Sequence, residues 1–222
     1  VRVRTFHLHS CPGILGSIPD RFGDDLHDIV DLDLRSNSLT GGLPVSWMDK
    51  LDDSEYGWTK KGQTYLNNGE WLLLRDCRRK ETSRVLPSLV KLNLANNHFN
   101  TSVSSVVRTI STLANLADVD LSGNELHGAL TQIDFTACRL NQTKVFTIDP
   151  QNYAVDPFPK LVRLTLDSNP GITQLPPSGL GASILQYFSA TGCNLTGALS
   201  PDYMTIPMLD LRENPAMQSK SL

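Results

Sequence analysis

The chain contains 222 residues, of which 40% are hydrophobic and 19% are charged, and its formal net charge is −3 at pH 7. This composition is typical of a folded protein rather than a disordered one. The slightly acidic balance provides no basic field to attract nucleic acid, and the longest apolar runs, such as 71–74, are far too short for a membrane span. We therefore expect no nucleic-acid partner, and a membrane connection only through segments absent from this chain.

One spacing of apolar residues recurs along the whole chain. In 29–44, IVDLDLRSNSLTGGLP, apolar residues stand at offsets 0, 3, 5 and 10, and an asparagine stands at offset 8. Neither the helical period nor strand alternation explains this spacing, which is that of a leucine-rich repeat. Seven units align in chain order, and their polar position is occupied by Cys11, Asn37, Asn97, Asn124, Asn169, Cys193 and Asn214.

Each unit predicts one short strand, because the two leucines of L-x-L, such as Leu32 and Leu34, point to the same side of an extended chain. Stacked units place these strands side by side over one continuous core. We therefore predict a mostly β fold (an α/β solenoid): a curved leucine-rich-repeat solenoid with a concave parallel sheet, about seven repeats and two insertions. The outer faces are expected to be irregular or short helical, with a helix over Val103–Leu113. The asparagine amides are expected to bond to backbone groups of adjacent turns.

Two intervals between units are too long for one repeat. The polar positions are spaced by 26, 60, 27, 45, 24 and 21 residues, whereas one repeat needs roughly 20–29. Either degenerate repeats around Cys77 and Cys138 fill the two gaps, or the gaps hold insertions at about 50–84 and 131–156. We favour insertions, because Arg79 replaces an apolar residue and Cys138 follows Asn124 by only 14 residues. The prediction is one solenoid domain over 1–222. It is expected to be a fragment of a longer protein, because the chain lacks an initiator Met and neither end shows a polar cap.

The residues after the asparagines suggest a subclass. Leu-Thr-Gly-Gly-Leu-Pro at 39–44, Leu-His-Gly-Ala-Leu at 126–130 and Leu-Thr-Gly-Ala-Leu at 195–199 resemble the plant-type leucine-rich repeats. That subclass includes receptor-kinase ectodomains, polygalacturonase-inhibiting proteins and surface-coat proteins of some protists. The resemblance implies an extracellular solenoid that binds through its concave sheet. The chain departs from the common pattern in its two insertions and in lacking the paired-cysteine caps.

The side chains between the consensus leucines are predicted to point outward on the concave face. Either this polar face only keeps the solenoid hydrated, or it binds a partner. The candidate ligand-binding residues are His7, His9, Asp31, Asp33, Arg35, Lys91, Asn93, Asp118, Asp120, Arg163, Tyr187 and Arg212. The histidine pair and the aspartate pairs do not assemble the six or more converging oxygens of a calcium site or a full set of transition-metal ligands, so no metal and no cofactor is predicted. Catalytic signatures such as H-E-x-x-H, G-x-S-x-G and the P-loop are absent, so the chain is predicted not to be an enzyme.

The first insertion supplies a second candidate surface. Trp58, Arg75, Arg78 and Arg79 are candidate docking residues, although charge pairing within the loop is the alternative. Cys77 and Cys138 lie in different insertions, so a disulfide between them is possible if the long loops bring them together. Two separate thiols are the alternative.

Three N-x-[ST] sequons, at Asn100, Asn141 and Asn194, favour glycosylation and passage through the secretory pathway. We therefore expect a non-enzymatic recognition module for a protein partner, located outside the cell or at its surface. The alternatives are a structural subunit of a surface coat, filament or larger complex, and an enzyme-inhibitor protein. An intracellular scaffold is also compatible with the pattern.

Overall fold

The computed structural model describes residues 3–23, 26–47, 86–113, 115–130, 158, 160–177 and 179–218, and the backbone of 63–65 and 71–73. The chain divides into two compact units. The first consists of 1–49, 82–133 and 156–222, and the second consists of 50–81 and 134–155. One domain over 1–222, with insertions bounded at about 50–84 and 131–156, stays a prediction.

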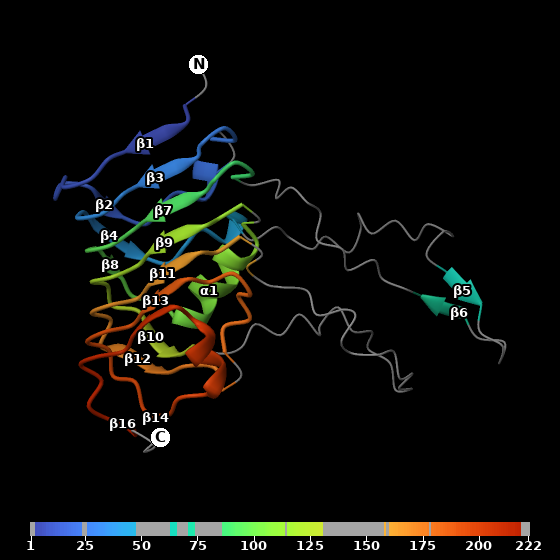
Figure 1. Cartoon of the computed structure of the whole chain (residues 1–222). Coiled ribbons are helices and arrows are strands. Elements are labelled where there is room, and N and C mark those ends of the chain that lie inside the picture. Colours follow the sequence, from blue (N-terminus) through green and yellow to red (C-terminus); the bar gives the residue numbers. More distant parts are fainter. Residues whose placement is uncertain are drawn as a thin grey trace. The chain divides into compact units, whose positions relative to one another are not determined.

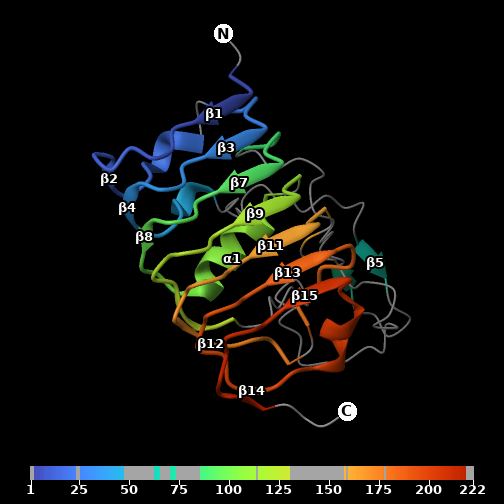
Figure 2. The same ribbon diagram turned by 60° about the vertical axis from the view of Figure 1, so that its left-hand side comes forward.

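A seven-stranded parallel sheet organises the first unit (Figures 1 and 2). The strands follow one another across the sheet in chain order, one from each predicted repeat. They are β1 (Thr5–His7), β3 (Asp31–Asp33), β7 (Lys91–Asn93), β9 (Asp118–Asp120), β11 (Arg163–Thr165), β13 (Tyr187–Ser189) and β15 (Met208–Asp210). The predicted fold class, a mostly β leucine-rich-repeat solenoid, is confirmed.

Direct pairing between strands decides what lies in the two long intervals. Asp31 of β3 pairs with Lys91 of β7, and Asp118 of β9 pairs with Arg163 of β11. Neighbouring strands of a sheet lie only about 4.8 Å apart, so no further strand fits between either pair. The hidden-repeat alternative is therefore excluded for this sheet, and each interval contains an insertion between consecutive repeats.

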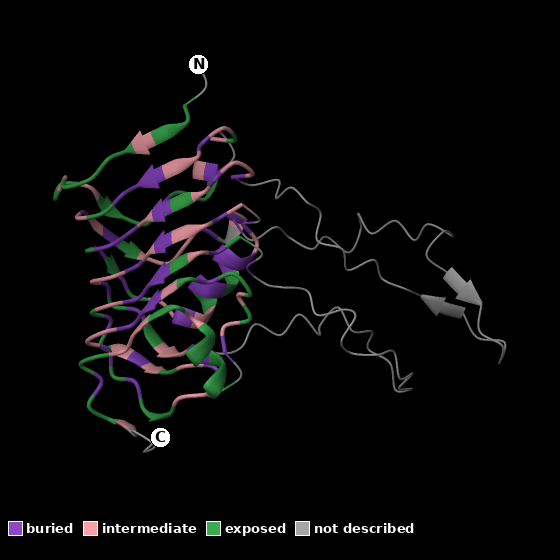
Figure 3. Cartoon of the chain, viewed as in Figure 1, coloured by how far each residue is buried: buried purple, intermediate pink, exposed green. Residues whose placement is uncertain are grey.

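The core lies between this sheet and the outer part of each repeat (Figure 3). The middle residue of every sheet strand points inward, and the apolar consensus residues before and after each strand, such as Ile29 and Leu34, belong to the same cluster. Leu32, Leu92, Val119, Leu164 and Phe188 are each at most 1% exposed. At the two edges Phe6 and Leu209 are only partly buried, because each edge strand has a neighbour on one side alone.

The outer part of the repeats is more regular than predicted. Seven further short parallel strands run there: β2 (Leu15–Gly16), β4 (Ser38–Gly41), β8 (His98–Phe99), β10 (His127–Ala129), β12 (Gly171–Gln174), β14 (Gly197–Ala198) and β16 (Met217–Gln218). The expectation of irregular or helical outer faces was thus wrong for these segments. The predicted helix is confirmed as α1 (Val103–Ser111). Short 3-10 helices span Asp20–Gly23, Val45–Trp47 and Pro201–Thr205. None of the helices among the described residues has the length and apolar character needed to cross a membrane.

The asparagine of each repeat links it to its neighbours, as predicted. The amide of Asn124 donates to the carbonyl oxygen of Leu94 in the preceding repeat at 3.1 Å and to that of Leu121 in its own repeat at 3.0 Å. Its side-chain oxygen accepts from the N–H of Phe99 at 3.1 Å. Asn37, Asn97, Asn169 and Asn214 repeat this arrangement. Where cysteine replaces asparagine, the Cys193 thiol donates to the Leu166 oxygen at 3.4 Å.

A left-handed residue precedes the asparagine or cysteine in all seven repeats. The φ angles lie between 54° and 63° at Ser10, Ser36, Asn96, Gly123, Ser168, Gly192 and Glu213. Six of these residues are glycine, serine or asparagine, and only glycine adopts this region without steric cost. Glu213 is the bulkiest residue to occupy the position.

Replacing Glu213 by glycine is therefore expected to stabilise the fold. A left-handed conformation costs a residue with a Cβ roughly 1–2 kcal/mol, and the extra chain entropy of glycine offsets roughly 0.5–1 kcal/mol of the relief. We expect Glu213→Gly to raise the free energy of unfolding by about 0.5–1 kcal/mol in urea titrations. Glu213→Ala, which keeps the Cβ, is the control and should bring no gain. Equal effects of the two variants would show that the side chain, not the backbone, matters.

Tyr203 closes the core at the carboxyl-terminal end of the first unit. Its ring is 1% exposed and its centroid lies 6.1 Å from that of Phe188, and its hydroxyl donates to the Pro176 oxygen at 3.1 Å. Burial, followed by the charge of Asp202, raises the pKa of the Tyr203 hydroxyl well above its usual value.

The raised pKa predicts a loss of stability in alkali. In the unfolded chain this hydroxyl ionises near pH 10, whereas in the folded protein it stays neutral to higher pH. Its contribution is therefore complete below about pH 10 and lost as the pH rises towards the folded-state pKa. Urea titrations from pH 8 to 11 should show a steeper fall for the parent than for Tyr203→Phe. Parallel curves would contradict the prediction.

In the second unit the described backbone forms an antiparallel pair. Strand β5 (Gln63–Tyr65) pairs with β6 (Trp71–Leu73), with Gln63 opposite Leu73 and Tyr65 opposite Trp71. The candidate docking residues Trp58, Arg75, Arg78 and Arg79 lie outside the described residues.

Candidate functional site

The outward side chains of the seven-stranded sheet form rows that cross the strands. The strand register places the first row at Thr5, Asp31, Lys91, Asp118, Arg163, Tyr187 and Met208, and the second at His7, Asp33, Asn93, Asp120, Thr165, Ser189 and Asp210. Backbone bonds beyond the strands align a third row: His9, Arg35, Ala95, Ser122, Asp167, Thr191 and Arg212. We call these three rows the strand face. All the candidate ligand-binding residues belong to it.

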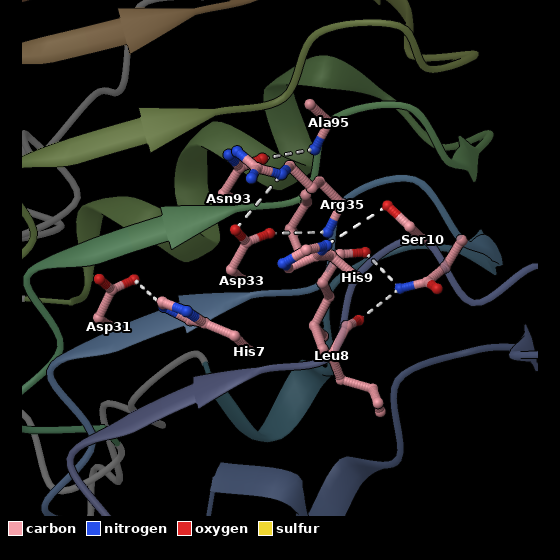
Figure 4. Close-up of polar contacts among 12 residues, drawn as sticks. His7, Leu8, His9, Ser10, Asp31, Asp33, Arg35, Asn93 and Ala95 are labelled. Carbon is pink, nitrogen blue, oxygen red and sulfur yellow. Dashed lines mark hydrogen bonds and ion pairs between the residues drawn. The ribbon is translucent and has the colours of Figure 1, made fainter.

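Polar side chains lie in close pairs on the strand face in the first two repeats (Figure 4). His7 Nε2 lies 3.3 Å from Asp31 Oδ1, and Arg35 Nε lies 3.5 Å from Asp33 Oδ2. The rings of His7 and His9 are tilted against each other, with centroids 6.5 Å apart. The sequence predicted that these five residues share a face, and the structure brings them together as two pairs with His9 beside them.

The acidic and amide residues of the second row have a structural task that sequence reasoning missed. Asp33, Asn93, Asp120 and Asp210 each accept a hydrogen bond, at 3.0–3.2 Å, from the backbone N–H two residues further on. Such a bond stabilises the turn that follows the strand. The repeated Asp/Asn two positions before the third row was the signal that could have revealed it. These side chains are therefore held in place rather than free to reorganise around a ligand.

Asp167 in the third row joins two repeats and was not among the candidates. Its Oδ1 accepts from the Ser189 hydroxyl at 2.5 Å and from the Thr191 N–H at 2.7 Å. Ser189 and the neighbouring Thr165 are buried, so this part of the second row offers little to a partner. Arg163, in the first row, is the exposed side chain of these two repeats on the strand face.

Arg163 contacts side chains of its own repeat and of its two neighbours. Its Nε lies 3.8 Å from Asp118 Oδ1 and 3.5 Å from Thr165 Oγ1. Its Cζ stands 4.6 Å from the centre of the Tyr187 ring, within the range of a cation–π contact. The guanidinium is thus oriented by residues from three neighbouring repeats, while the side chain remains 48% exposed.

Asp210 and Arg212 neutralise each other at the end of the sheet. Arg212 donates to both carboxylate oxygens, with Nη2 at 2.6 Å from Oδ2 and Nε at 2.9 Å from Oδ1. The hydrogen bonds from Arg212 hold the pKa of the Asp210 carboxyl below its usual range. Arg212 therefore contacts its carboxylate through two nitrogen atoms, whereas Arg163 approaches Asp118 through Nε alone, at 3.8 Å.

The remaining candidate positions are possible metal ligands, glycosylation sequons and cysteines. Among the described residues, no group of three or more His, Cys, Asp or Glu side chains could hold a metal ion. The side chains of Asn100 and Asn194 are exposed, so both sequons are accessible. Asn141, Cys77 and Cys138 lie outside the described residues, so the third sequon and the disulfide stay predictions. Cys11 and Cys193 are free thiols.

Comparison with solved structures assigns the fold to a class. No family model matches the chain, and no curated protein matches it. The plant peptide hormone receptor RGFR1, solved with RGF2, matches with a TM-score of 0.57 and 17% identity over 97% of this chain and 27% of that one. Pollen receptor kinase 3 matches with a TM-score of 0.59 and 18% sequence identity, and the match covers 99% of this chain and 77% of that one. The ectodomain of GASSHO1/SCHENGEN3 from Arabidopsis thaliana matches with a TM-score of 0.54 and 20% sequence identity. That match covers 91% of this chain and 17% of the other.

These matches and the repeated strand pattern show that the chain has a leucine-rich-repeat fold. The fold is similar to that of the leucine-rich-repeat ectodomain of GASSHO1/SCHENGEN3. The chain spans about a quarter of RGFR1, and most of the pollen receptor kinase 3 chain.

Proposed function

We propose that this chain is a non-enzymatic recognition module that binds a protein partner through the strand face. The observation that carries the proposal is the first row, where Arg163 is held by Asp118 and Tyr187 yet remains exposed. A rigid ladder of paired strands presents this row, so little conformational entropy is lost on binding. Under this proposal the carboxylates of the face have a structural task, because Asp33, Asp120 and Asp210 accept hydrogen bonds from backbone N–H groups. Asp33 and Asp210 also lie beside arginine side chains.

The comparisons support the same use of the fold. RGFR1 is described as a peptide hormone receptor in complex with RGF2, and the GASSHO1/SCHENGEN3 ectodomain was solved with CASPARIAN STRIP INTEGRITY FACTOR 2. Both were solved in complex with a partner. We extend that mode of action to this chain on the strength of its own strand face.

The direct test identifies a partner and maps its contacts. The purified chain would be incubated with secreted proteins of its source organism, cross-linked and analysed by mass spectrometry. Cross-links should concentrate on the strand face. Capture of a secreted hydrolase whose activity is blocked would point to the inhibitor alternative, and large assemblies of the chain itself would point to the structural one.

Charge reversal on the strand face is expected to lower the affinity of the chain for that partner. Lys91→Glu combined with Arg163→Glu should lower affinity at least tenfold, because two cations become anions beside Asp118. Arg108→Glu is the matched control. Arg108 is exposed on α1, outside the strand face, so this variant should stay within about twofold. Equal loss in both, measured by titration calorimetry, would place the binding surface elsewhere.

We also propose that the chain is extracellular and carries N-linked glycans at its accessible sequons. Asn100 follows β8 and Asn194 precedes β14, so glycans there would leave the strand face uncovered. Secretion from a eukaryotic host followed by enzymatic deglycosylation should show a mass loss that disappears stepwise in Asn100→Gln and Asn194→Gln. A single unmodified species would contradict this.

A further inference from the structure

The cations of the strand face are not equally available to a partner. Arg35 at one end lies beside the carboxylate of Asp33, at 3.5 Å. Arg212 at the other end is bonded to both oxygens of Asp210. A new carboxylate that approaches such a cation is also repelled by the carboxylate already beside it, which reduces the net attraction.

Lys91 and Arg163 differ from them. They flank Asp118 in the first row, so two cations share one carboxylate. Arg163 approaches that carboxylate only through Nε, at 3.8 Å, and Lys91 forms no ion pair with any residue that the structure describes. The Cζ atom of Arg163 lies 4.6 Å from the centre of the Tyr187 ring. Its two Nη groups take no part in the contacts with Asp118 and Thr165, so they remain for a bidentate contact with a carboxylate.

An apolar surface adjoins this cation in the same row. Tyr187 is half-buried, and Met208, which pairs with it in register, is 61% exposed. The other exposed large apolar side chains of the described residues, Val3, Leu8, Leu15, Ile184 and Met204, lie outside the three rows. Arginine, tyrosine and methionine are enriched at the centres of protein interfaces. The row therefore offers one cation and one apolar platform side by side.

The sign of the surrounding charge restricts the occupant. The strand face has six aspartates against its four lysine and arginine residues. A polyanion such as nucleic acid or an anionic membrane would meet net repulsion there. A partner with a single carboxylate placed over Arg163 and apolar atoms beside it fits both features.

We propose that the first row binds a segment of a protein partner in the polyproline II conformation, in which an acidic residue and a large apolar residue are three positions apart. The carboxylate would pair with Arg163, supported by the charge of Lys91, and the apolar side chain would pack on Tyr187 and Met208. Arg163 and Met208 are separated by two strand spacings, which is about 10 Å. A polyproline II segment has three residues per turn and rises about 3.1 Å per residue, so residues three positions apart cover that distance and point to the same side. This inference rests on the proposed function, since it assumes that a protein binds the strand face.

The test selects ligands without assuming their sequence. A library of random 12-residue peptides, displayed within a carrier protein, would be selected against the full chain. Enriched peptides would then be synthesised with blocked ends and their affinities measured by fluorescence anisotropy. The variants are Arg163→Gln, which keeps the length but removes the charge, and Met208→Ala. Arg108→Gln is the matched control for loss of an exposed arginine outside the strand face.

The expected result is enrichment of the acidic-x-x-apolar spacing. Arg163→Gln and Met208→Ala should each lower the affinity for those peptides roughly tenfold, while Arg108→Gln should change it by no more than about twofold. High salt should weaken binding to the parent and have less effect on Arg163→Gln. Enriched peptides without that spacing would overturn the inference, as would binding that Arg35→Gln weakens and Arg163→Gln does not. The proposed function would stand in both cases. If no peptide is enriched and partner cross-links also avoid the strand face, both fail.

Discussion

Replacing Asn169 by alanine is expected to lower the free energy of unfolding by about 3–4 kcal/mol. The Asn169 side chain is fully buried, and its amide donates to the carbonyl oxygens of Leu121 and Leu166 at 3.1 and 2.8 Å. Its oxygen accepts from the N–H of Leu126 at 3.1 Å. Alanine leaves the Leu126 N–H buried without a partner, which costs roughly 1–3 kcal/mol. The Leu121 and Leu166 oxygens keep their bonds from Asn124 and Cys193 but each loses a second bond, worth roughly 0.5–1.5 kcal/mol. Urea unfolding followed by circular dichroism measures the change.

Two variants make this result specific. Asn194→Ala removes an exposed asparagine one repeat away and is expected to cost no more than about 0.5 kcal/mol. Asn169→Cys should fall between, because Cys193 occupies the equivalent position and its thiol still donates to a carbonyl oxygen of the preceding repeat. If Asn169→Ala behaved like Asn194→Ala, water would be replacing the amide, and the side-chain ladder would not hold adjacent repeats together.

A methyl group at Gly171 is expected to cost about 2–3 kcal/mol. Gly171 opens β12 where it pairs with β10, and a Cβ there would lie 2.8 Å from both the Leu126 carbonyl oxygen and the His127 Cβ. Backbone atoms cannot move aside without separating the outer strands, and overpacking of this kind typically costs roughly 1–3 kcal/mol. Gly171→Ala should therefore lower the urea midpoint.

Gly13→Ala is the matched control for that substitution. No heavy atom lies within 4 Å of a Cβ placed at Gly13, so its effect should stay within about 0.5 kcal/mol. Hydrogen exchange adds a second readout: in Gly171→Ala the amides of the outer strands should exchange faster, while those of the seven-stranded sheet keep more of their protection. Uniform loss of protection would show that the outer strands and the sheet unfold together.

The sequence predicted which residues lie on the strand face better than it predicted how their charges are paired. Alternation along L-x-x-L-x-L identifies the outward positions, so the spacing of the repeats is enough to assign Lys91, Asp118, Arg163 and Tyr187 to one row. What the pattern does not contain is the state of each charge. Arg163 and Arg212 occupy comparable outward positions, yet one stacks on a tyrosine and the other is paired with Asp210.

The outer strands show the same limit. Leu126, Gly128 and Leu130 matched the plant-type repeat pattern, but two- to four-residue strands such as β10 carry no periodicity of their own. They form because stacking brings equivalent backbone segments of successive repeats within hydrogen-bond distance. A feature that exists only between repeats is not encoded within one of them.

The sequence by itself determined the repeat, the inward leucines, the task of the asparagines and the rows of the strand face. These follow from the periodicity of an extended chain, which is a local property. The tertiary structure alone decided that β3 pairs directly with β7 and that β9 pairs with β11, that aspartates of the second row bond to the backbone, and that Arg163 remains exposed between Asp118 and Tyr187. Each of these depends on distances between residues that are 20 or more positions apart in the sequence or on the rotamer a side chain adopts among its neighbours, and apolar spacing carries no information about either.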